Sequence, residues 1–281
     1  MDIYVSTLAL QGHKVEEMIE LARANHWALE FSSGLPYRKD MKILYKDADI
    51  KKIPHNYFPA PQVPFVLNLA SVNNKIRKQS LKHCKDVLRM AKQSDSPFFA
   101  AHAGFCIDPK PAELGNKINY TTVFNKEYNK EIFIESVYEI LKLAEELEID
   151  FLIENNVIAP FNMVDGVNPL LCCGSEEISW LFTTISHRHL GLLLDTAHLK
   201  VSCQTLGLNL LEEFEKIKTF IKAFHHSDND SFSDNNKMFK EDYWILPMIY
   251  LYKKYPHIIE VKNINPETIN KQINLLKEYG C

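Results

Sequence analysis

The chain has 281 residues, of which 46% are hydrophobic and 24% are charged. This length exceeds that of a usual single domain unless the fold is a barrel, so one α/β barrel or two small domains would fit. The formal net charge of -4 excludes a global positive field that would draw the protein to nucleic acid or to an anionic membrane.

The first residues, MDIYVSTLAL, lack the basic region of a secretory signal peptide, and no apolar run approaches the about 18 residues that span a bilayer. We therefore expect a soluble, cytoplasmic protein without a membrane partner. Its cysteines show no metal-finger spacing, and the adjacent pair is unsuited to form a disulfide, so we expect reduced thiols. They are Cys84, Cys106, Cys172, Cys173, Cys203 and Cys281.

Short apolar, β-branched or aromatic runs alternate with amphipathic stretches of helical period along the chain. The predicted strands are residues 3–8, 27–32, 64–70, 97–103, 150–155, 189–195, 221–226 and 257–262. The predicted helices are residues 15–25, 78–93, 133–148, 175–186, 209–220 and 266–280. Residues 241–255 are a further helical candidate despite Pro247, and the signal after the second strand is weaker.

Eight strands that alternate with helices predict a (β/α)8 TIM barrel, formed by residues 1–281 as one domain. An open, doubly wound sheet is the structural alternative. That fold would carry a glycine-rich turn after its first strand, whereas the segment TLALQGHKVEE has one glycine. We therefore favour the closed barrel.

Polar side chains end five successive predicted strands, the fourth to the eighth. They are His102, Glu154, Asp195, His225 and Glu260. TIM barrels keep their chemistry at the C-terminal ends of their strands, so these groups would meet at one mouth. Each of them alone has an ordinary interpretation as a buried polar group with a partner. Three converging carboxylates would repel one another unless a cation neutralised them, which favours a divalent metal.

The predicted ligands supply three carboxylates and one imidazole. They are Glu154, Asp195, His225 and Glu260. This set suits one Mn²⁺, Mg²⁺, Co²⁺ or Zn²⁺ ion and argues against a structural thiolate site. Four protein ligands leave coordination positions for substrate oxygens, so we predict a catalytic site.

The motifs HAG, IENN, LLLDTAHL, HHSDN and IIEVK, in this order at strand ends, resemble the xylose isomerase-like TIM barrel superfamily. The resemblance covers essentially the whole chain. The superfamily contains sugar isomerases and epimerases, inosose and dehydroshikimate dehydratases, and endonuclease IV. In members that act on small keto-sugars, the matching four positions bind one divalent metal, and the resemblance implies that Glu154 and Glu260 also transfer protons. It further implies that His198 contacts the substrate.

Two adjacent histidines compete for the ligand position in FHHSD. The family pattern places the ligand three residues before the aspartate, which selects His225. Strand alternation would then turn His226 to the opposite face, where we expect a packed or capping residue.

Departures from the pattern separate the members of the superfamily. Endonuclease IV-like members hold three zinc ions, and they need a histidine after the third strand and an Asp-x-His pair after the seventh. At the predicted third strand the chain reads VLNLASVNN, with Asn68 nearby and no histidine. The later loop offers Asp228, Asp230 and Asp234 without such a pair. With the negative net charge, this disfavours DNA cleavage, and no nucleic-acid partner is expected.

The chemistry implied is proton transfer at a carbon next to a carbonyl, with an enediolate stabilised by the metal. Glu154 and Glu260 lie on nonadjacent strands and could flank a sugar or sugar phosphate from two sides. Such a pair would give an epimerase or an isomerase, and loss of a β-hydroxyl would give a dehydratase; the sequence does not choose among them. A barrel that only binds sugar is a further alternative, disfavoured because all four ligand types are present.

We expect the long loops over residues 104–128 and 156–174 to complete the pocket as a lid or wall. Aromatic residues that could contact a sugar or simply pack the loops are Phe105, Tyr120, Phe161 and Trp244. His102 and Lys262 are further candidates for substrate binding, and Lys262 is otherwise a solvated strand-end lysine. Glu30 is a weaker site candidate at the end of the second strand. Homo-oligomerisation is left open.

Overall fold

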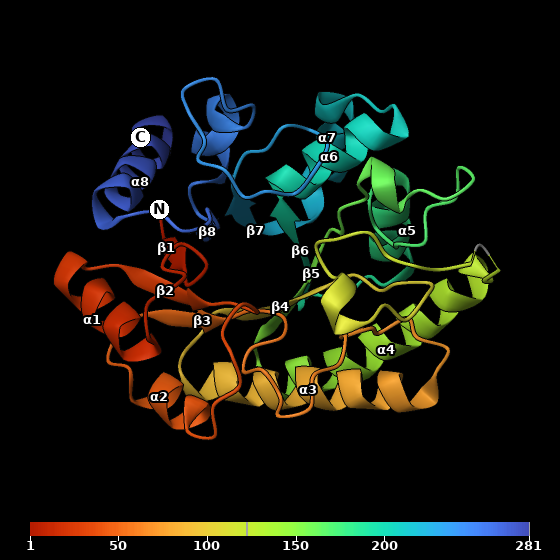
Figure 1. Cartoon of the computed structure of the whole chain (residues 1–281), viewed down its shortest axis with the longest axis horizontal. Helices are drawn as coiled ribbons and strands as arrows, with labels where there is room; N and C mark the ends of the chain where they lie inside the picture. Colours follow the sequence, from red (N-terminus) through yellow and green to blue (C-terminus); the bar gives the residue numbers. More distant parts are fainter. Residues whose placement is uncertain (122, 281) are drawn as a thin grey trace.

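The computed structural model describes residues 1–121 and 123–280, and its strands form a parallel barrel surrounded by helices (Figure 1). The strands are β1 (Ile3–Ser6), β2 (Ala28–Phe31), β3 (Lys52–Pro54), β4 (Phe98–His102), β5 (Asp150–Glu154), β6 (Leu190–Asp195), β7 (Ile221–His226) and β8 (His257–Ile259). Their order is β3-β2-β1-β8-β7-β6-β5-β4. A single bridge between His55 and Ala100 joins β3 to β4, so the barrel is nearly closed and the predicted TIM barrel is confirmed.

Helices cover the outside of the barrel, with α3 and α4 along the lower edge of Figure 1 and α5 to α7 at the upper right. The α-helices are α1 (Val15–Asn25), α2 (Met41–Asp47), α3 (Asn74–Gln93), α4 (Lys126–Leu147), α5 (Ser175–Thr184), α6 (Thr196–Leu206), α7 (Leu210–Ile217) and α8 (Pro266–Gly280). Short 3₁₀ helices are η1 (Pro111–Glu113), η2 (Pro160–Asn162), η3 (Lys218–Phe220) and η4 (Leu246–Tyr252). Among these described helices, none is long and apolar enough to cross a membrane.

The hydrophobic core has two layers, because successive strand residues point to opposite faces. A small inner cluster fills the barrel, with side chains from seven strands. It consists of Tyr4, Ile53, Phe98, Ala100, Leu152, Leu193, Ala223 and Ile258. A larger cluster packs the outer strand faces against the helices. Because side chains fill the interior of the barrel, we expect a functional site at the strand ends.

The third strand lies at Lys52–Pro54, so the prediction of a strand at residues 64–70 is wrong. That apolar run is largely buried, but its backbone forms no ladder. The Ser80 hydroxyl accepts from the Asn68 N–H, and the Asn68 amide side chain bonds to the backbone of Phe105. Side-chain hydrogen bonds therefore satisfy the backbone polar groups of this buried loop. The sequence pattern alone cannot distinguish such an apolar loop from a buried strand.

Three helical segments also differ from the expectation. The weak region after β2 contains α2, and α6 begins directly at the end of β6, where no separate helix is predicted. The candidate helix at 241–255 is reduced to the 3₁₀ helix η4, which has Pro247 in its first turn. A proline there lacks an N–H and cannot sit inside a longer α-helix without loss of a hydrogen bond.

Five cysteines are buried and unbonded, as predicted for reduced thiols, and Cys281 lies outside the described residues. Burial raises the pKa of the Cys106 and Cys203 thiols to about 12. Because the thiolate is the reactive form, these side chains behave as small apolar core residues.

We expect the protein to lose stability in mild acid, partly because His83 is buried in its neutral form. Burial lowers the pKa of His83 to about 4, while its ring nitrogen Nε2 lies 3.1 Å from the Asn56 carbonyl oxygen. The unfolded chain takes up this proton near pH 6.5, so stability is lost as pH falls from about 6.5 to about 4. Urea denaturation checks this. As pH falls from about 6.5 to about 4, the free energy of unfolding of His83→Gln should increase relative to that of wild type. A difference that does not change with pH would contradict the prediction.

Candidate functional site

Ionisable side chains lie at the C-terminal ends of seven of the eight strands. They are Glu30 in β2, His55 after β3, His102 in β4, Glu154 in β5, Asp195 in β6, His225 in β7 and Glu260 after β8. All are buried except His102 and Glu260, which are partly exposed. The parallel arrangement brings residues more than 200 positions apart to one end of the barrel.

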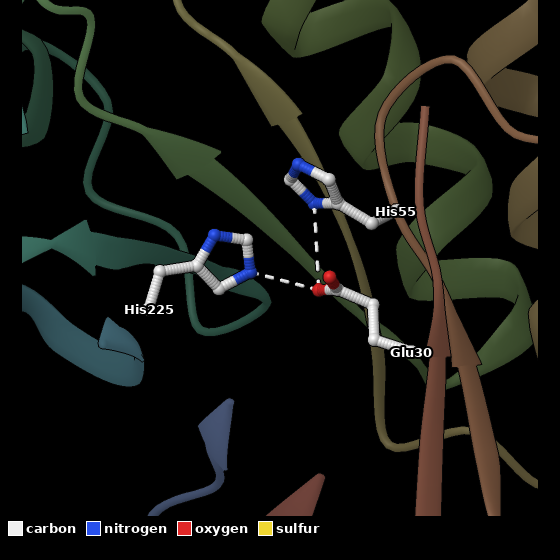
Figure 2. Close-up of side chains that lie close together, drawn as sticks. All are labelled: Glu30, His55 and His225. Carbon is white, nitrogen blue, oxygen red and sulfur yellow. Dashed lines mark hydrogen bonds and ion pairs between the residues drawn. The ribbon is translucent and has the colours of Figure 1, made fainter. Parts of the chain in front are cut away.

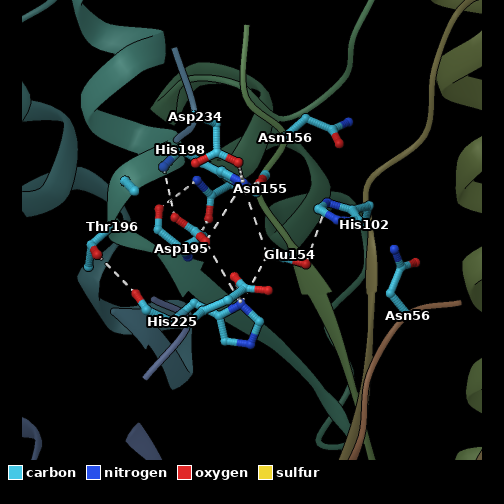
Figure 3. A network of polar contacts seen from close by, with 12 residues as sticks. Asn56, His102, Glu154, Asn155, Asn156, Asp195, Thr196, His198, His225 and Asp234 are labelled. Atoms are coloured by element: carbon cyan, nitrogen blue, oxygen red, sulfur yellow. Dashed lines mark hydrogen bonds and ion pairs between the residues drawn. The ribbon is translucent and has the colours of Figure 1, made fainter. Parts of the chain in front are cut away.

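The four predicted metal ligands converge on one point, and Figure 3 labels three of them, Glu154, Asp195 and His225. Their ligand atoms lie within 4.8 Å of one another. The ring nitrogen Nδ1 of His225 lies 2.9 Å from Glu260 Oε2 and 3.3 Å from Glu154 Oε1. It lies 3.8 Å from Asp195 Oδ2. The structure therefore brings the set together with three carboxylates around one imidazole.

The burial and missing hydrogen bonds of these ligand atoms suit the binding of a cation. Asp195 Oδ2 and His225 Nδ1, which lie 3.8 Å apart, are buried and have no hydrogen-bond partner. Asp195 is held in place by its other oxygen, Oδ1, which caps α6 by accepting from the backbone N–H of His198 at 2.8 Å. Burial, reinforced by the neighbouring carboxylates, raises the pKa of Asp195 to about 7, although His198 opposes the shift. Acceptor atoms that face one another without a donor are what a divalent ion neutralises.

Glu154 contacts two further histidines on the side away from this cluster. His55 Nε2 lies 3.1 Å and His102 Nδ1 lies 3.4 Å from Glu154 Oε2. These three residues form a second group whose atoms are close enough to hold a metal ion. Burial alone would raise the pKa of Glu154, but the surrounding histidines lower it well below its usual range.

Sequence reasoning missed His55. It follows β3 directly, so the statement that no histidine follows the third strand is wrong, and the error comes from the misplaced strand. The motif KIPHN carried the signal, but a strand of three residues that includes a lysine and a proline is hard to identify. The missing Asp-x-His pair is unaffected: Asp234 is followed by Asn235 and Asn236.

His198 lies beside the metal cluster with both ring nitrogens facing oxygen atoms. Nδ1 lies 2.9 Å from the Asn155 carbonyl oxygen, and Nε2 lies 3.2 Å from Asp234 Oδ2. Burial alone would lower the pKa of His198, but the nearby carboxylates of Asp195 and Asp234 raise it well above its usual range. The imidazole therefore offers a fixed, charged donor at the edge of the site.

His226 points away from the cluster, as predicted from strand alternation. Its ring stacks on His257 with centroids 5.1 Å apart, and its Nε2 lies 2.9 Å from Nδ1 of His257. Its Nδ1 lies 3.1 Å from the Tyr243 hydroxyl. His226 is thus a packed residue between the barrel and its helices.

A cavity of about 500 Å³ opens above the cluster. Glu154, Glu260, His102 and His198 contribute to its lining, together with apolar side chains from the long loops. Phe105 and Phe161 belong to this lining. Tyr120 instead joins the two loops, because its hydroxyl donates to the Asn162 carbonyl at 2.9 Å.

Two other candidates lie outside this arrangement. Trp244 packs edge-on against Phe214, with ring centroids 5.6 Å apart. Lys262 is exposed and does not belong to the described lining of the cavity. No lysine or arginine occurs among the described residues that form this lining.

Comparisons with known structures agree with the fold. A D-tagatose 3-epimerase-like protein superposes with a TM-score of 0.74 and 22% identity, covering 99% of this chain and 97% of that one. The D-psicose 3-epimerase of Clostridium cellulolyticum H10, solved with D-tagatose, gives 0.67 and 15% identity, with 100% and 98% covered. An IolI protein with a bound zinc atom gives 0.66 and 13% identity, with 99% and 96% covered. At these identities the similarity establishes the fold alone.

Sequence comparison identifies the family. An uncharacterized protein of Methanocaldococcus jannaschii is 25% identical over 219 residues, which is 76% of this chain and, at 66%, just under two thirds of that protein. The model of one family, described as xylose isomerase-like TIM barrel, matches residues 17–275. The chain therefore belongs to the xylose isomerase-like TIM barrel family.

Proposed function

We propose that this protein is a divalent-metal-dependent isomerase or epimerase of a sugar, acting by proton transfer at a carbon next to a carbonyl. The observation that carries the proposal is the convergence of four ligand atoms beside the cavity, two of which, Asp195 Oδ2 and His225 Nδ1, are buried and unpartnered. The ligands would be Glu154, Asp195, His225 and Glu260. A bound divalent ion supplies Lewis-acid polarisation of a carbonyl oxygen.

The protein groups suit the remaining steps. Glu154 and Glu260 come from nonadjacent strands and both line the cavity, so a substrate between them would meet a carboxylate at two sides. One carboxylate takes the proton from carbon and the other returns one. His198 Nε2 would donate a hydrogen bond to a substrate oxygen in place of Asp234, its partner in the structure. The apolar loop residues would exclude water from the reacting carbon.

The cavity lining favours an uncharged sugar. Phosphate groups are bound mainly by arginine, lysine and backbone N–H groups, and the described lining has no lysine or arginine. The structural relatives include a D-tagatose 3-epimerase-like protein and a D-psicose 3-epimerase solved with D-tagatose, and both of these sugars are uncharged ketoses. We therefore propose a free ketose or a related polyol as the substrate class.

His55 favours a second candidate, an endonuclease IV-like nuclease. With His102 and Glu154 it would hold a second ion next to the first, and paired ions are common in phosphodiester hydrolysis. Against this candidate stand the cavity lining and the missing Asp-x-His pair. Cleavage of a duplex with an abasic site would support the nuclease and contradict the sugar enzyme.

Proton exchange tests the proposed function. The protein reconstituted with Mn²⁺ or Co²⁺ is incubated with D-tagatose, D-psicose and cyclitols in deuterated water. We expect deuterium at the carbon next to the carbonyl of at least one compound, detected by NMR, and the product separates epimerisation, isomerisation and dehydration. Absence of exchange across the panel, with metal bound, would contradict a sugar isomerase or epimerase.

A further inference from the structure

The cluster of metal ligands has a buried carboxylate beneath it that takes no part in the proposed reaction. Glu30 lies in β2, and its side chain is 0% exposed. A carboxylate that is removed from water destabilises the fold unless it is paired, so its position requires a partner. Figure 2 shows that partner: the Glu30 carboxylate points toward the ring of His225, and the ring of His55 faces the same oxygen.

The contact with His225 is the short one. Glu30 Oε2 lies 2.7 Å from His225 Nε2, which is hydrogen-bond distance. The same oxygen lies 3.9 Å from Nδ1 of His55, beyond that distance. Because a carboxylate can only accept, the hydrogen of this bond is on Nε2 of His225.

This bond determines what the other face of the imidazole presents. With Nε2 protonated, a neutral His225 has its lone pair on Nδ1, the atom that points at Glu154, Asp195 and Glu260. Nδ1 makes no hydrogen bond in the structure, even though it lies 2.9 Å from Glu260 Oε2. Nδ1 and not Nε2 is therefore the ring nitrogen that can offer a lone pair to a cation where the three carboxylates converge.

We propose that Glu30 is a positioning residue that fixes the tautomer and ring orientation of His225, so that Nδ1 is ready to bind a divalent ion. This inference rests on the proposed metal site. Carboxylate partners of this kind raise the basicity of a ligating histidine, and their loss typically costs about 10- to 100-fold in metal affinity.

The test is the Kd for Mn²⁺, measured by calorimetry on the metal-free, full-length protein. We expect Glu30→Gln to bind Mn²⁺ about 10- to 100-fold more weakly. Glu30→Asp should lose affinity similarly, since the shortened side chain moves its oxygen away from His225, and it serves as a second variant if Glu30→Gln does not fold. Glu213→Gln is the matched control, because Glu213 is buried but bonds to Ser175 and Lys216 away from the site. Its affinity should equal that of wild type.

A double-mutant cycle separates positioning from simple attraction by the charge of Glu30. In a His225→Gln background, Glu30→Gln should change the Mn²⁺ affinity by less than about twofold, because its effect passes through the histidine. A full 10-fold effect in that background, or wild-type affinity in both Glu30 variants, would overturn the proposal. If the wild-type protein itself binds no Mn²⁺, Co²⁺ or Zn²⁺, the proposed function fails instead.

Discussion

Glu154→Gln should reduce proton exchange on the ketose substrate by at least about 10³-fold while leaving the barrel folded. Glu154 is expected to act twice, as a metal ligand through one oxygen and as a proton-transfer group at the cavity. Glutamine keeps the volume of the side chain but can neither take up a proton nor neutralise a cation. Exchange is followed by NMR in deuterated water, and folding by circular dichroism.

The control for this variant is Glu213→Gln, which changes a buried carboxylate of the same size between α5 and α7. It should keep full exchange activity. Wild-type exchange in Glu154→Gln would remove Glu154 from the mechanism. Equal losses in both variants would show that the effect follows from a disturbed fold rather than from the site.

Asp195→Asn should bind divalent ions at least about 100-fold more weakly and yet be more stable than wild type without metal. The lost affinity follows from removing a ligand, which should cost no less than removing a residue that supports one. The gained stability follows from relieving a buried carboxylate among other carboxylates, and asparagine is an equally good cap for α6. The readouts are Mn²⁺ calorimetry and urea denaturation of the metal-free proteins.

The pH dependence of this stability difference has a defined sign. In the folded protein without metal, the pKa of Asp195 is raised to about 7, so its charged form destabilises the fold. The cost grows as pH rises from about 4 to about 7 and is complete above that. The stability advantage of Asp195→Asn should increase over the same range. A metal-free variant less stable than wild type at pH 8 would contradict this account.

The sequence predicted the second half of the barrel well because its strands are apolar runs that end in a charge. Asp195 after LGLLL and Glu154 after DFLI are examples, and such residues have few alternatives to a strand end. Their convergence followed from the barrel alone. What the structure adds is the distances, the unpartnered atoms and the cap from Asp195 to α6.

The first half was harder to predict for physical reasons. β3 has three residues, and Lys52 is buried there because its ammonium group donates to backbone carbonyls of the preceding segment, which no pattern reveals. The apolar loop around Asn68 has the composition of a buried strand and was therefore predicted in place of β3. This one error hid His55, and with it the second group around Glu154. The contact between Glu30 and His225 joins residues 195 positions apart and needed three-dimensional distances.

The central claim is that the strand ends from β5 to β8 hold a divalent ion. The most direct measurement is metal content by mass spectrometry, on protein purified without chelator or affinity metal. The account predicts near one divalent ion per chain, lost in a variant that carries both Glu154→Gln and Glu260→Gln. Two or more ions per chain would favour the nuclease candidate over the sugar enzyme. No bound ion in the wild-type protein, even after reconstitution with Mn²⁺, Co²⁺ and Zn²⁺, would contradict the account.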